Sequence, residues 1–225
     1  MIRAVIFDFD GVLANSEPLH FRAFRDVLAE QGLALTEASY YDRYLGYDDL
    51  GAFRAIAADA SVRLTEPQIA ALALRKAEQL EVLERGASVL FPGARDAIMR
   101  MAGVGPMAIA SGALRAEIIR VLQREGLTTF FLVLVAAEDT LACKPDPAPY
   151  ARAVELIGAR LGHPFEPGDC LAIEDSRWGL LSAKSAGLHT VAITHSYSAS
   201  DLAEADIVID HLDQLTPQLL LALSR

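Results

Sequence analysis

The sequence predicts an α/β protein with a doubly wound, mostly parallel sheet, a Rossmann-like core, and an inserted all-helical domain. Three observations predict this fold. Short apolar runs recur along the chain, helical stretches separate the later runs, and residues 16–86 contain no convincing strand. Alternating strands and helices favour a sheet that helices cover on both faces.

Six short runs are predicted as strands because they are apolar on both faces. The first, residues 2–7, is apolar apart from Arg3. Runs of this kind are typical of strands buried in a parallel sheet. The remaining five predicted strands cover residues 106–110, 131–136, 170–173, 190–193 and 207–209.

Helical patterns lie between the later strands. Residues 113–125 place Ile118 and Leu122 on one face, and Gly126 is a typical stop signal. Two more helices are predicted over residues 147–161 and 176–186, ending near Gly162 and Gly187.

Residues 16–86 are predicted to form a helical domain inserted after the first strand. Ala and Leu recur there at helical spacing. Pro92 and Gly93 then mark the return to the strand-and-helix pattern. We therefore predict an α/β core over residues 1–15 and 87–225 and a helical cap over 16–86, with helices at 17–31, 48–60 and 67–85.

Composition sets limits on function. The 225 residues are 52% hydrophobic and 22% charged, which is enough apolar material for a core and excludes wholesale disorder. Twenty basic and thirty acidic residues give a net charge of −10, the opposite of a general nucleic-acid binder. An anionic substrate would therefore need a local cation.

Targeting and redox features are sparse. Cys143 and Cys170 form no C-x-x-C pair, which argues against a disulfide framework or zinc site and favours a reducing compartment. The longest apolar run, residues 130–137, is far shorter than the roughly 20 residues of a membrane-spanning helix. The run before Asp8 is too short for a signal-peptide core. We expect a cytoplasmic protein without a membrane partner, either a monomer or a weak homo-oligomer.

Polar and charged residues follow the first four predicted strands. In open α/β sheets, ligands bind outside the carboxyl ends of the strands. We therefore expect these residues to meet at one edge of the sheet: Asp8 and Asp10, then Ser111 and Gly112, then Lys144 beyond a loop, then Glu174 and Asp175.

These residue types suit a phosphoryl group held beside a metal ion. Packed carboxylates repel one another unless a cation lies among them, and Mg²⁺ prefers oxygen ligands. Asp8 and Asp175 are candidate direct ligands, with Glu174 beside them. Lys144 suits one phosphate oxygen, and the Ser111 hydroxyl with the amides that follow it suits another.

Two aspartates two residues apart can divide the catalytic work. Asp8 can act as a nucleophile that forms an aspartyl-phosphate. Asp10 can protonate the leaving oxygen and then activate water. Asp146, near Lys144, is interpreted as a helix cap rather than a catalytic group.

The chain resembles the haloacid dehalogenase superfamily. Residues 8–13 (Asp-Phe-Asp-Gly-Val-Leu), Ser111, Lys144-Pro145 and residues 174–176 (Glu-Asp-Ser) are similar, in order, to its four motifs. Residues 15–20, Asn-Ser-Glu-Pro-Leu-His, resemble the branch that holds β-phosphoglucomutase and many small-molecule phosphatases. The resemblance implies a Mg²⁺-dependent enzyme that acts on a small phosphorylated metabolite and closes its cap.

The resemblance also implies roles for single residues. Mg²⁺ would have a further contact with the backbone carbonyl of Asp10, and His20 would lie near the hinge and help to position Asp10. Gly46 resembles the specificity loop of the cap. Tyr44 and Tyr47 beside it either contact a neutral part of the substrate or pack at the surface.

The cap loop departs from the mutases. They carry a Lys directly before the loop Gly and an Arg three residues after it, which bind a second phosphate. This chain has Leu45 and Asp49 instead, and a carboxylate repels a second phosphate. Arg43 or Arg54 could substitute, although neither stands at the matching position.

A phosphatase of small phosphomonoesters, such as a sugar phosphate or a phosphoglycolate-like acid, is therefore the leading hypothesis. A phosphomutase is the alternative. A phosphonate hydrolase would need a lysine in the cap to form a Schiff base. This function is disfavoured because the only lysine in the cap is Lys76, in the third predicted cap helix. A haloacid dehalogenase is disfavoured because Asp10 is present. A non-catalytic phospholigand-binding relative is disfavoured because the charged motif residues are all present: Asp8, Asp10, Lys144 and Asp175.

Overall fold

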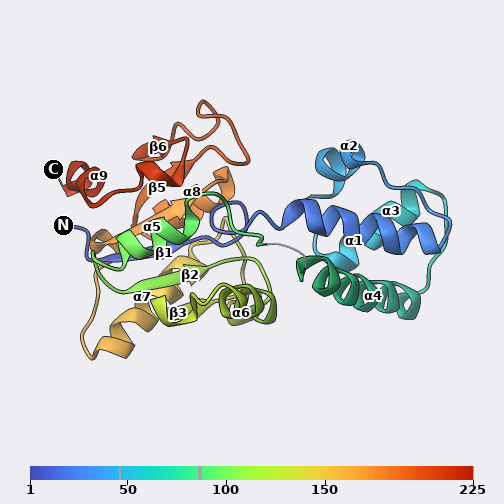
Figure 1. Ribbon diagram of the computed structural model, residues 1–225, viewed down its shortest axis with the longest axis horizontal. Coiled ribbons are helices and arrows are strands. Elements are labelled where there is room, and N and C mark those ends of the chain that lie inside the picture. The colour runs from blue at the N-terminus through green and yellow to red at the C-terminus, as the bar shows by residue number, and fades with distance from the viewer. Residues whose placement is uncertain (46, 86–87, 225) are drawn as a thin grey trace. The chain divides into compact units, whose positions relative to one another are not determined.

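The computed structural model describes residues 1–45, 47–85 and 88–224, and the chain forms two compact units (Figure 1). One unit, the core, is Met1–Asn15 with Val89–Arg225, and the other, the cap, is Ser16–Ser88. The predicted boundary between residues 86 and 87 lies outside the described residues. Each unit packs around apolar side chains of its own.

The core contains a six-stranded sheet in which every neighbouring pair is parallel, and this confirms the predicted fold class. The strand order is β3-β2-β1-β4-β5-β6. The strands are β1 (Ala4–Phe7), β2 (Met107–Ala110), β3 (Phe131–Val135), β4 (Cys170–Glu174), β5 (His189–Ile193) and β6 (Ile207–Ile209).

Strand order reverses beside β1. Successive strands run outward from β1 through β2 to β3 on one side and from β4 to β6 on the other. Phe7 pairs with Ile173 of β4, and the Asp8 amide donates to the Ile173 carbonyl at 2.9 Å. The carboxyl ends of β1 and β4 therefore flank a topological switch point, where such sheets bind ligands.

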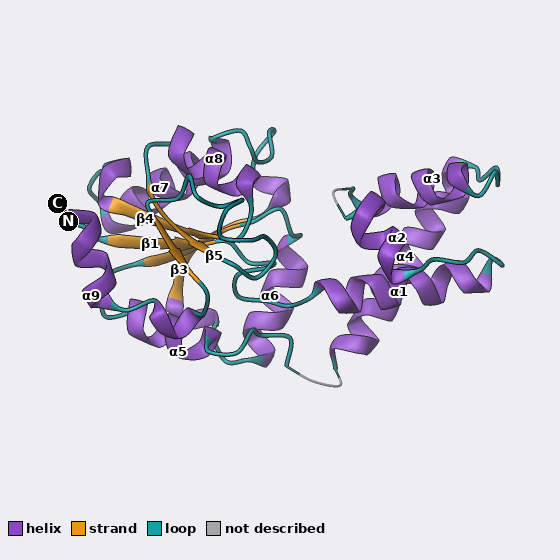
Figure 2. Cartoon of the chain, turned by 90° about the horizontal axis from the view of Figure 1, so that it is seen from above, coloured by secondary structure: helices purple, strands orange, loops and turns teal. Residues whose placement is uncertain are grey.

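Helices cover both faces of the sheet (Figure 2). In that view α7 and α8 lie on one side and α5 and α9 on the other. Ile6 and Val133 of the sheet share a buried cluster with Tyr150 and Ile157 of α7. The core helices are α5 (Ala94–Met101), α6 (Arg115–Arg124), α7 (Ala148–Leu161), α8 (Arg177–Ser185) and α9 (Pro217–Leu220).

The described part of the cap is built from helices. The three predicted helices form, and a short helical segment between the first two, which sequence reasoning missed, completes the unit. Phe24 and Phe53 pack at its centre with ring centroids 4.9 Å apart. The elements are α1 (Glu17–Glu30), α2 (Glu37–Ser39), a π-helical turn (Tyr40–Tyr44), α3 (Asp49–Asp59) and α4 (Glu66–Glu84).

Tyr44 belongs to the interior of the cap. Its ring is buried, and its hydroxyl donates to Asp59 Oδ2 at 2.6 Å. Neither expected role, substrate contact or surface packing, describes it. The hydroxyl has a partner inside the cap, so the residue holds α3 against the turn before it.

Two features bear on the remaining expectations. Within residues 1–45, 47–85 and 88–224, no helix has the length and apolar character needed to cross a bilayer. Cys143 is exposed, Cys170 is buried, and both are free thiols.

Candidate active site

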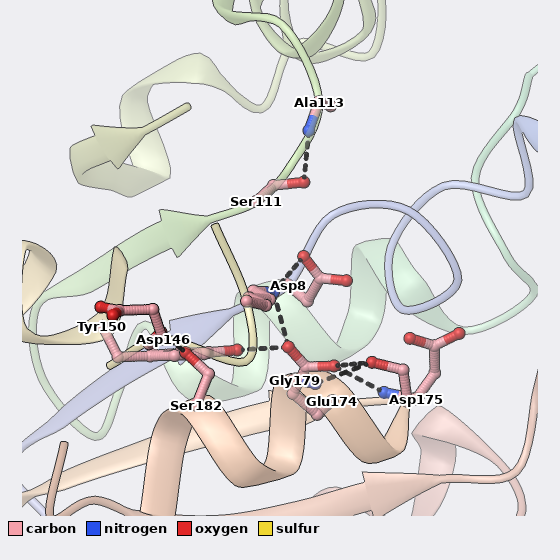
Figure 3. Close-up of polar contacts among 11 residues, drawn as sticks. Asp8, Ser111, Ala113, Asp146, Tyr150, Glu174, Asp175, Gly179 and Ser182 are labelled. Carbon is pink, nitrogen blue, oxygen red and sulfur yellow. Dashed lines mark hydrogen bonds and ion pairs between the residues drawn. The ribbon is translucent and has the colours of Figure 1, made fainter. Parts of the chain in front are cut away.

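Three buried carboxylates converge at the switch point (Figure 3). Asp8 follows β1, Glu174 ends β4, and Asp175 is the next residue. Ligand atoms of the three lie within 4.8 Å of one another. The side chain of Asp10 is not part of this group. Three oxygen donors this close match the chemistry of a hard divalent cation such as Mg²⁺.

Lys144 lies between two of these carboxylates. Its Nζ donates to Asp8 Oδ1 at 2.8 Å and to Glu174 Oε1 at 2.6 Å. Burial works to lower the pKa of Lys144, but the two carboxylates outweigh burial and raise that pKa above its ordinary value. The lysine is therefore a fixed positive charge beside Asp8.

The Glu174 carboxylate is held on both oxygens. Oε1 accepts from Lys144 and from the Tyr150 hydroxyl, the latter at 2.7 Å. Oε2 accepts from the Ser176 hydroxyl at 3.1 Å and from the Asp175 amide at 3.3 Å. A Cβ on Gly179 would lie 1.9 Å from Glu174 Cδ, so only glycine leaves room for this carboxylate.

Two of the carboxylates have strongly raised pKa values. Burial raises the pKa of Asp8 to about 7, and Lys144 only partly opposes this effect. Burial, with Asp8 and Glu174 close by, raises the pKa of Asp175 to about 7. A divalent cation would relieve this repulsion and displace the protons, so the donor set fits Mg²⁺.

The turn after Asp10 comes very close to Asp175. Gly11 has φ of +78°, and a Cβ on it would lie 1.9 Å from Asp175 Oδ2. A side chain at this position would meet both backbone strain and a steric clash. The turn thus carries Asp10, which is partly exposed, past the carboxylate cluster.

Ser111 and Gly112 lie where β2 ends. Ser111 is buried, its amide donates to the Val135 carbonyl at 3.0 Å, and its Oγ accepts from the Ala113 amide at 3.1 Å. Ser111, Gly112 and Lys144 line one pocket together with Cys143. Asp146 Oδ1 accepts from the Ala148 amide at 2.8 Å, as a helix cap does.

Sequence reasoning missed three residues of this site. Tyr150 is fully buried and donates to Glu174, the Ser196 hydroxyl donates to Asp175, and His195 Nδ1 lies 2.8 Å from the Gly11 carbonyl oxygen. His195 and Ser196 follow the fifth predicted strand, so the rule that ligands bind beyond strand ends could have found both.

The cap has a polar cluster of its own around Lys76. This lysine is fully buried in α4, and its Nζ donates to Asp49 Oδ1 at 2.7 Å and lies 3.0 Å from His20 Nδ1. Tyr47 is 56% exposed. The structure thus places His20 beside Lys76, while Gly46 lies outside the described residues.

Comparisons with known proteins identify the fold and its relatives. Residues 2–187 match the family model described as haloacid dehalogenase-like hydrolase. The chain is 32% identical to Protein CbbY of Rhodobacter capsulatus over 96% of both chains. It is 28% identical to hexitol phosphatase A of Escherichia coli, over 95% of this chain and 93% of that protein.

A solved relative carries a phosphorylated ligand. CbbY from Rhodobacter sphaeroides is 25% identical, covers 96% of both chains with a TM-score of 0.81, and was crystallised with phosphate. A variant of that protein was crystallised with xylulose-(1,5)bisphosphate. β-Phosphoglucomutase from Clostridium difficile has a TM-score of 0.79 at 21% identity, over 99% of this chain and 97% of that chain, and shows the shared fold.

Removing one partner of the cap ion pair should destabilise the protein. Asp49→Asn leaves the Lys76 ammonium buried without its carboxylate, and we expect a loss of about 1–3 kcal/mol in unfolding free energy. The range is modest because the Asp49 side chain is 35% exposed. Urea unfolding of the wild type, both single variants and the double variant gives the interaction free energy between Lys76 and Asp49. In a Lys76→Met background, Asp49→Asn should cost less than about 0.5 kcal/mol; an equal cost in both backgrounds contradicts the pairing.

Mg²⁺ affinity should fall with pH. Below about pH 7, Asp8 and Asp175 carry protons in the metal-free protein, and a cation must displace them. From pH 8 to pH 6 we expect the affinity to drop about tenfold for each proton displaced. The measurement is the rise in melting temperature with added Mg²⁺ at each pH.

Two variants control the pH experiment. Asp175→Asn should lose most of the stabilisation by Mg²⁺ at every pH, because it removes one oxygen donor and its charge. Asp213→Asn, at a carboxylate whose side chain is 77% exposed, should match the wild type. Equal stabilisation by Mg²⁺ at pH 6 and pH 8 would rule out binding at these carboxylates.

Proposed function

The chain belongs to the haloacid dehalogenase-like hydrolases, and on that premise we propose that it hydrolyses a small phosphomonoester at Asp8. The observation that supports this most is the arrangement of Lys144 between Asp8 and Glu174, with Asp175 beside them. A nucleophilic carboxylate, a fixed cation and a set of metal donors are what phosphoryl transfer to an aspartate requires.

In the first step, Asp8 attacks phosphorus. A bond forms between a carboxylate oxygen and phosphorus, the ester P–O bond breaks, and Asp10 gives its proton to the leaving oxygen. Lys144 hydrogen bonds to Oδ1 of Asp8, so we assign the attack to Oδ2. The products are the free alcohol and an aspartyl-phosphate.

In the second step, water attacks the phosphorus of the aspartyl-phosphate. Asp10, now ionised, takes a proton from that water, the bond between phosphorus and Asp8 breaks, and inorganic phosphate leaves. We propose that Lys144, the Ser111 hydroxyl and the Gly112 amide hold the phosphoryl oxygens in both steps. These three residues line one pocket.

Mg²⁺ is the proposed cofactor. Asp8, Glu174, Asp175 and the backbone carbonyl of Asp10 would hold it, and when bound it would offset the charge that develops on the phosphoryl group. The three carboxylates lie close enough together to share one ion. The hydrogen bonds on Glu174 suggest that this residue also orients Lys144.

A sugar phosphate is the substrate class we propose. Hexitol phosphatase A and phosphoglycolate phosphatase are named among the relatives, at 28% and 26% identity. CbbY, which has been crystallised with a sugar bisphosphate, is also a relative. We further propose that His20, Gly46 and Tyr47 of the cap act in substrate selection.

The cap charges favour hydrolysis over mutase chemistry. A mutase must bind a second phosphate, and the cap cations considered for that role already pair with carboxylates. Arg43 lies 2.5 Å from Asp59, and Arg54 lies 2.6 Å from Glu66. The similarity to β-phosphoglucomutase, at 21% identity, supports a shared fold and not a shared function. Lys76 is fully buried and ion-paired with Asp49, so its Nζ is not available to form the Schiff base that a phosphonate hydrolase needs.

Phosphate release from a panel of sugar phosphates, phosphoglycolate and nucleotides tests the proposal. We expect rapid release with Mg²⁺ on at least one sugar phosphate and none with a chelator. Asp8→Asn should reduce release to background because the nucleophile is lost. Asp10→Asn should reduce it by about 10²–10⁴-fold, the usual share of acid–base catalysis.

Each outcome of the panel has a clear meaning. If the main product is an isomerised sugar phosphate and little free phosphate forms, the protein is a mutase and not a phosphatase. Wild-type turnover by Asp8→Asn would refute the covalent mechanism. A protein that binds phosphate but releases none from any substrate would be a binding relative, and the proposed function would fail.

A further inference from the structure

The loop after β5 contacts two parts of the site that come from distant regions of the chain. His195 Nδ1 lies 2.8 Å from the Gly11 carbonyl oxygen, and the Ser196 hydroxyl donates to Asp175 Oδ2. Thr194 anchors the loop, because its amide donates to the Ile209 carbonyl of β6 at 3.0 Å. His195 thus contacts the turn that follows Asp10, and its neighbour Ser196 contacts the carboxylate cluster.

The orientation of the His195 ring is fixed by stacking. It lies on Phe91 with centroids 3.8 Å apart and planes 16° from parallel. The Phe91 amide donates to the Leu13 carbonyl at 2.9 Å, so the stacking partner is tied to the strand-end loop that also holds Gly11. A carbonyl oxygen only accepts, and therefore Nδ1 carries the proton and donates it.

Gly11 has little freedom to move on its own. Its amide donates to the Ala14 carbonyl at 2.9 Å, and its α-carbon faces Asp175 so closely that a Cβ there would overlap Oδ2. The residue is joined directly to Asp10. Holding the Gly11 carbonyl therefore restrains the backbone directly after Asp10.

We propose that His195 is a positioning residue for Asp10: by donating to the Gly11 carbonyl while stacked on Phe91, it holds Asp10 where it can protonate the leaving oxygen. This inference rests on the proposed function of Asp10. In this role His195 acts through the backbone beside Asp10 and not by contact with the substrate. Its contribution is to keep the proton donor in one place, and geometry of this kind matters in proton transfer.

Two substitutions separate the hydrogen bond from the stacking. His195→Phe keeps an aromatic ring against Phe91 and removes the donor. His195→Asn places an amide donor near the position of Nδ1 and removes the ring. Circular dichroism and melting temperature show whether each variant folds, and a Mg²⁺ titration followed by melting temperature shows whether the metal site is intact.

The decisive readout is how each variant depends on the leaving group. kcat/KM reports the steps up to formation of the aspartyl-phosphate, and p-nitrophenolate leaves without a proton, whereas a sugar alkoxide needs one. We expect His195→Phe to lower kcat/KM about tenfold for the best sugar phosphate, the effect of one lost orienting hydrogen bond. For p-nitrophenyl phosphate we expect a change of less than about twofold. His195→Asn should keep sugar phosphate kcat/KM within about threefold of the wild type.

Other results would overturn the inference. An equal loss on both substrates, or an equal loss in both variants, would make His195 a packing residue. Wild-type kinetics in His195→Phe would remove any role for the hydrogen bond. These results differ from failure of the proposed function, in which the wild type itself would release phosphate from neither substrate.

Discussion

Three buried carboxylates that share one small space are the constraint on which the rest of the site depends. Asp8, Glu174 and Asp175 would repel one another if all were ionised, and burial strengthens this effect because water cannot screen it. Lys144 offsets part of the charge. Burial first, and the neighbouring carboxylates second, raise the pKa values of Asp8 and Asp175 to about 7 despite Lys144, and a divalent cation would offset the remaining negative charge.

The fold supplies this crowding through topology. Adjacent parallel strands β1 and β4 end side by side at the switch point, so residues far apart in sequence meet there. Glycine then makes room, because any side chain at Gly11 or Gly179 would overlap the carboxylates of Asp175 or Glu174. A turn with positive φ at Gly11 and a close approach of the Gly179 backbone to Glu174 are thus built around charge.

Sequence reasoning reached the fold and the charged residues because both follow from local patterns. Apolar runs mark buried strands, and the residues after them lie at one edge of a parallel sheet. It missed Tyr150 because a hydroxyl on a helix face shows its role only when the partner carboxylate is known. It missed His195, whose partner is a backbone carbonyl that leaves no mark in the sequence. The burial of Tyr44 could not be predicted because the short helical segment to which it belongs has no clear periodicity.

If Asp8 carries the phosphoryl group during turnover, that group can be detected directly on the protein. The protein would be mixed with Mg²⁺ and a hydrolysed sugar phosphate, quenched in acid within one turnover, digested and analysed by mass spectrometry. We predict a phosphoryl group on the peptide that contains Asp8, which disappears as free phosphate forms. Turnover with Asp8 unmodified throughout, or with the phosphoryl group on another residue, would contradict a nucleophilic role for Asp8.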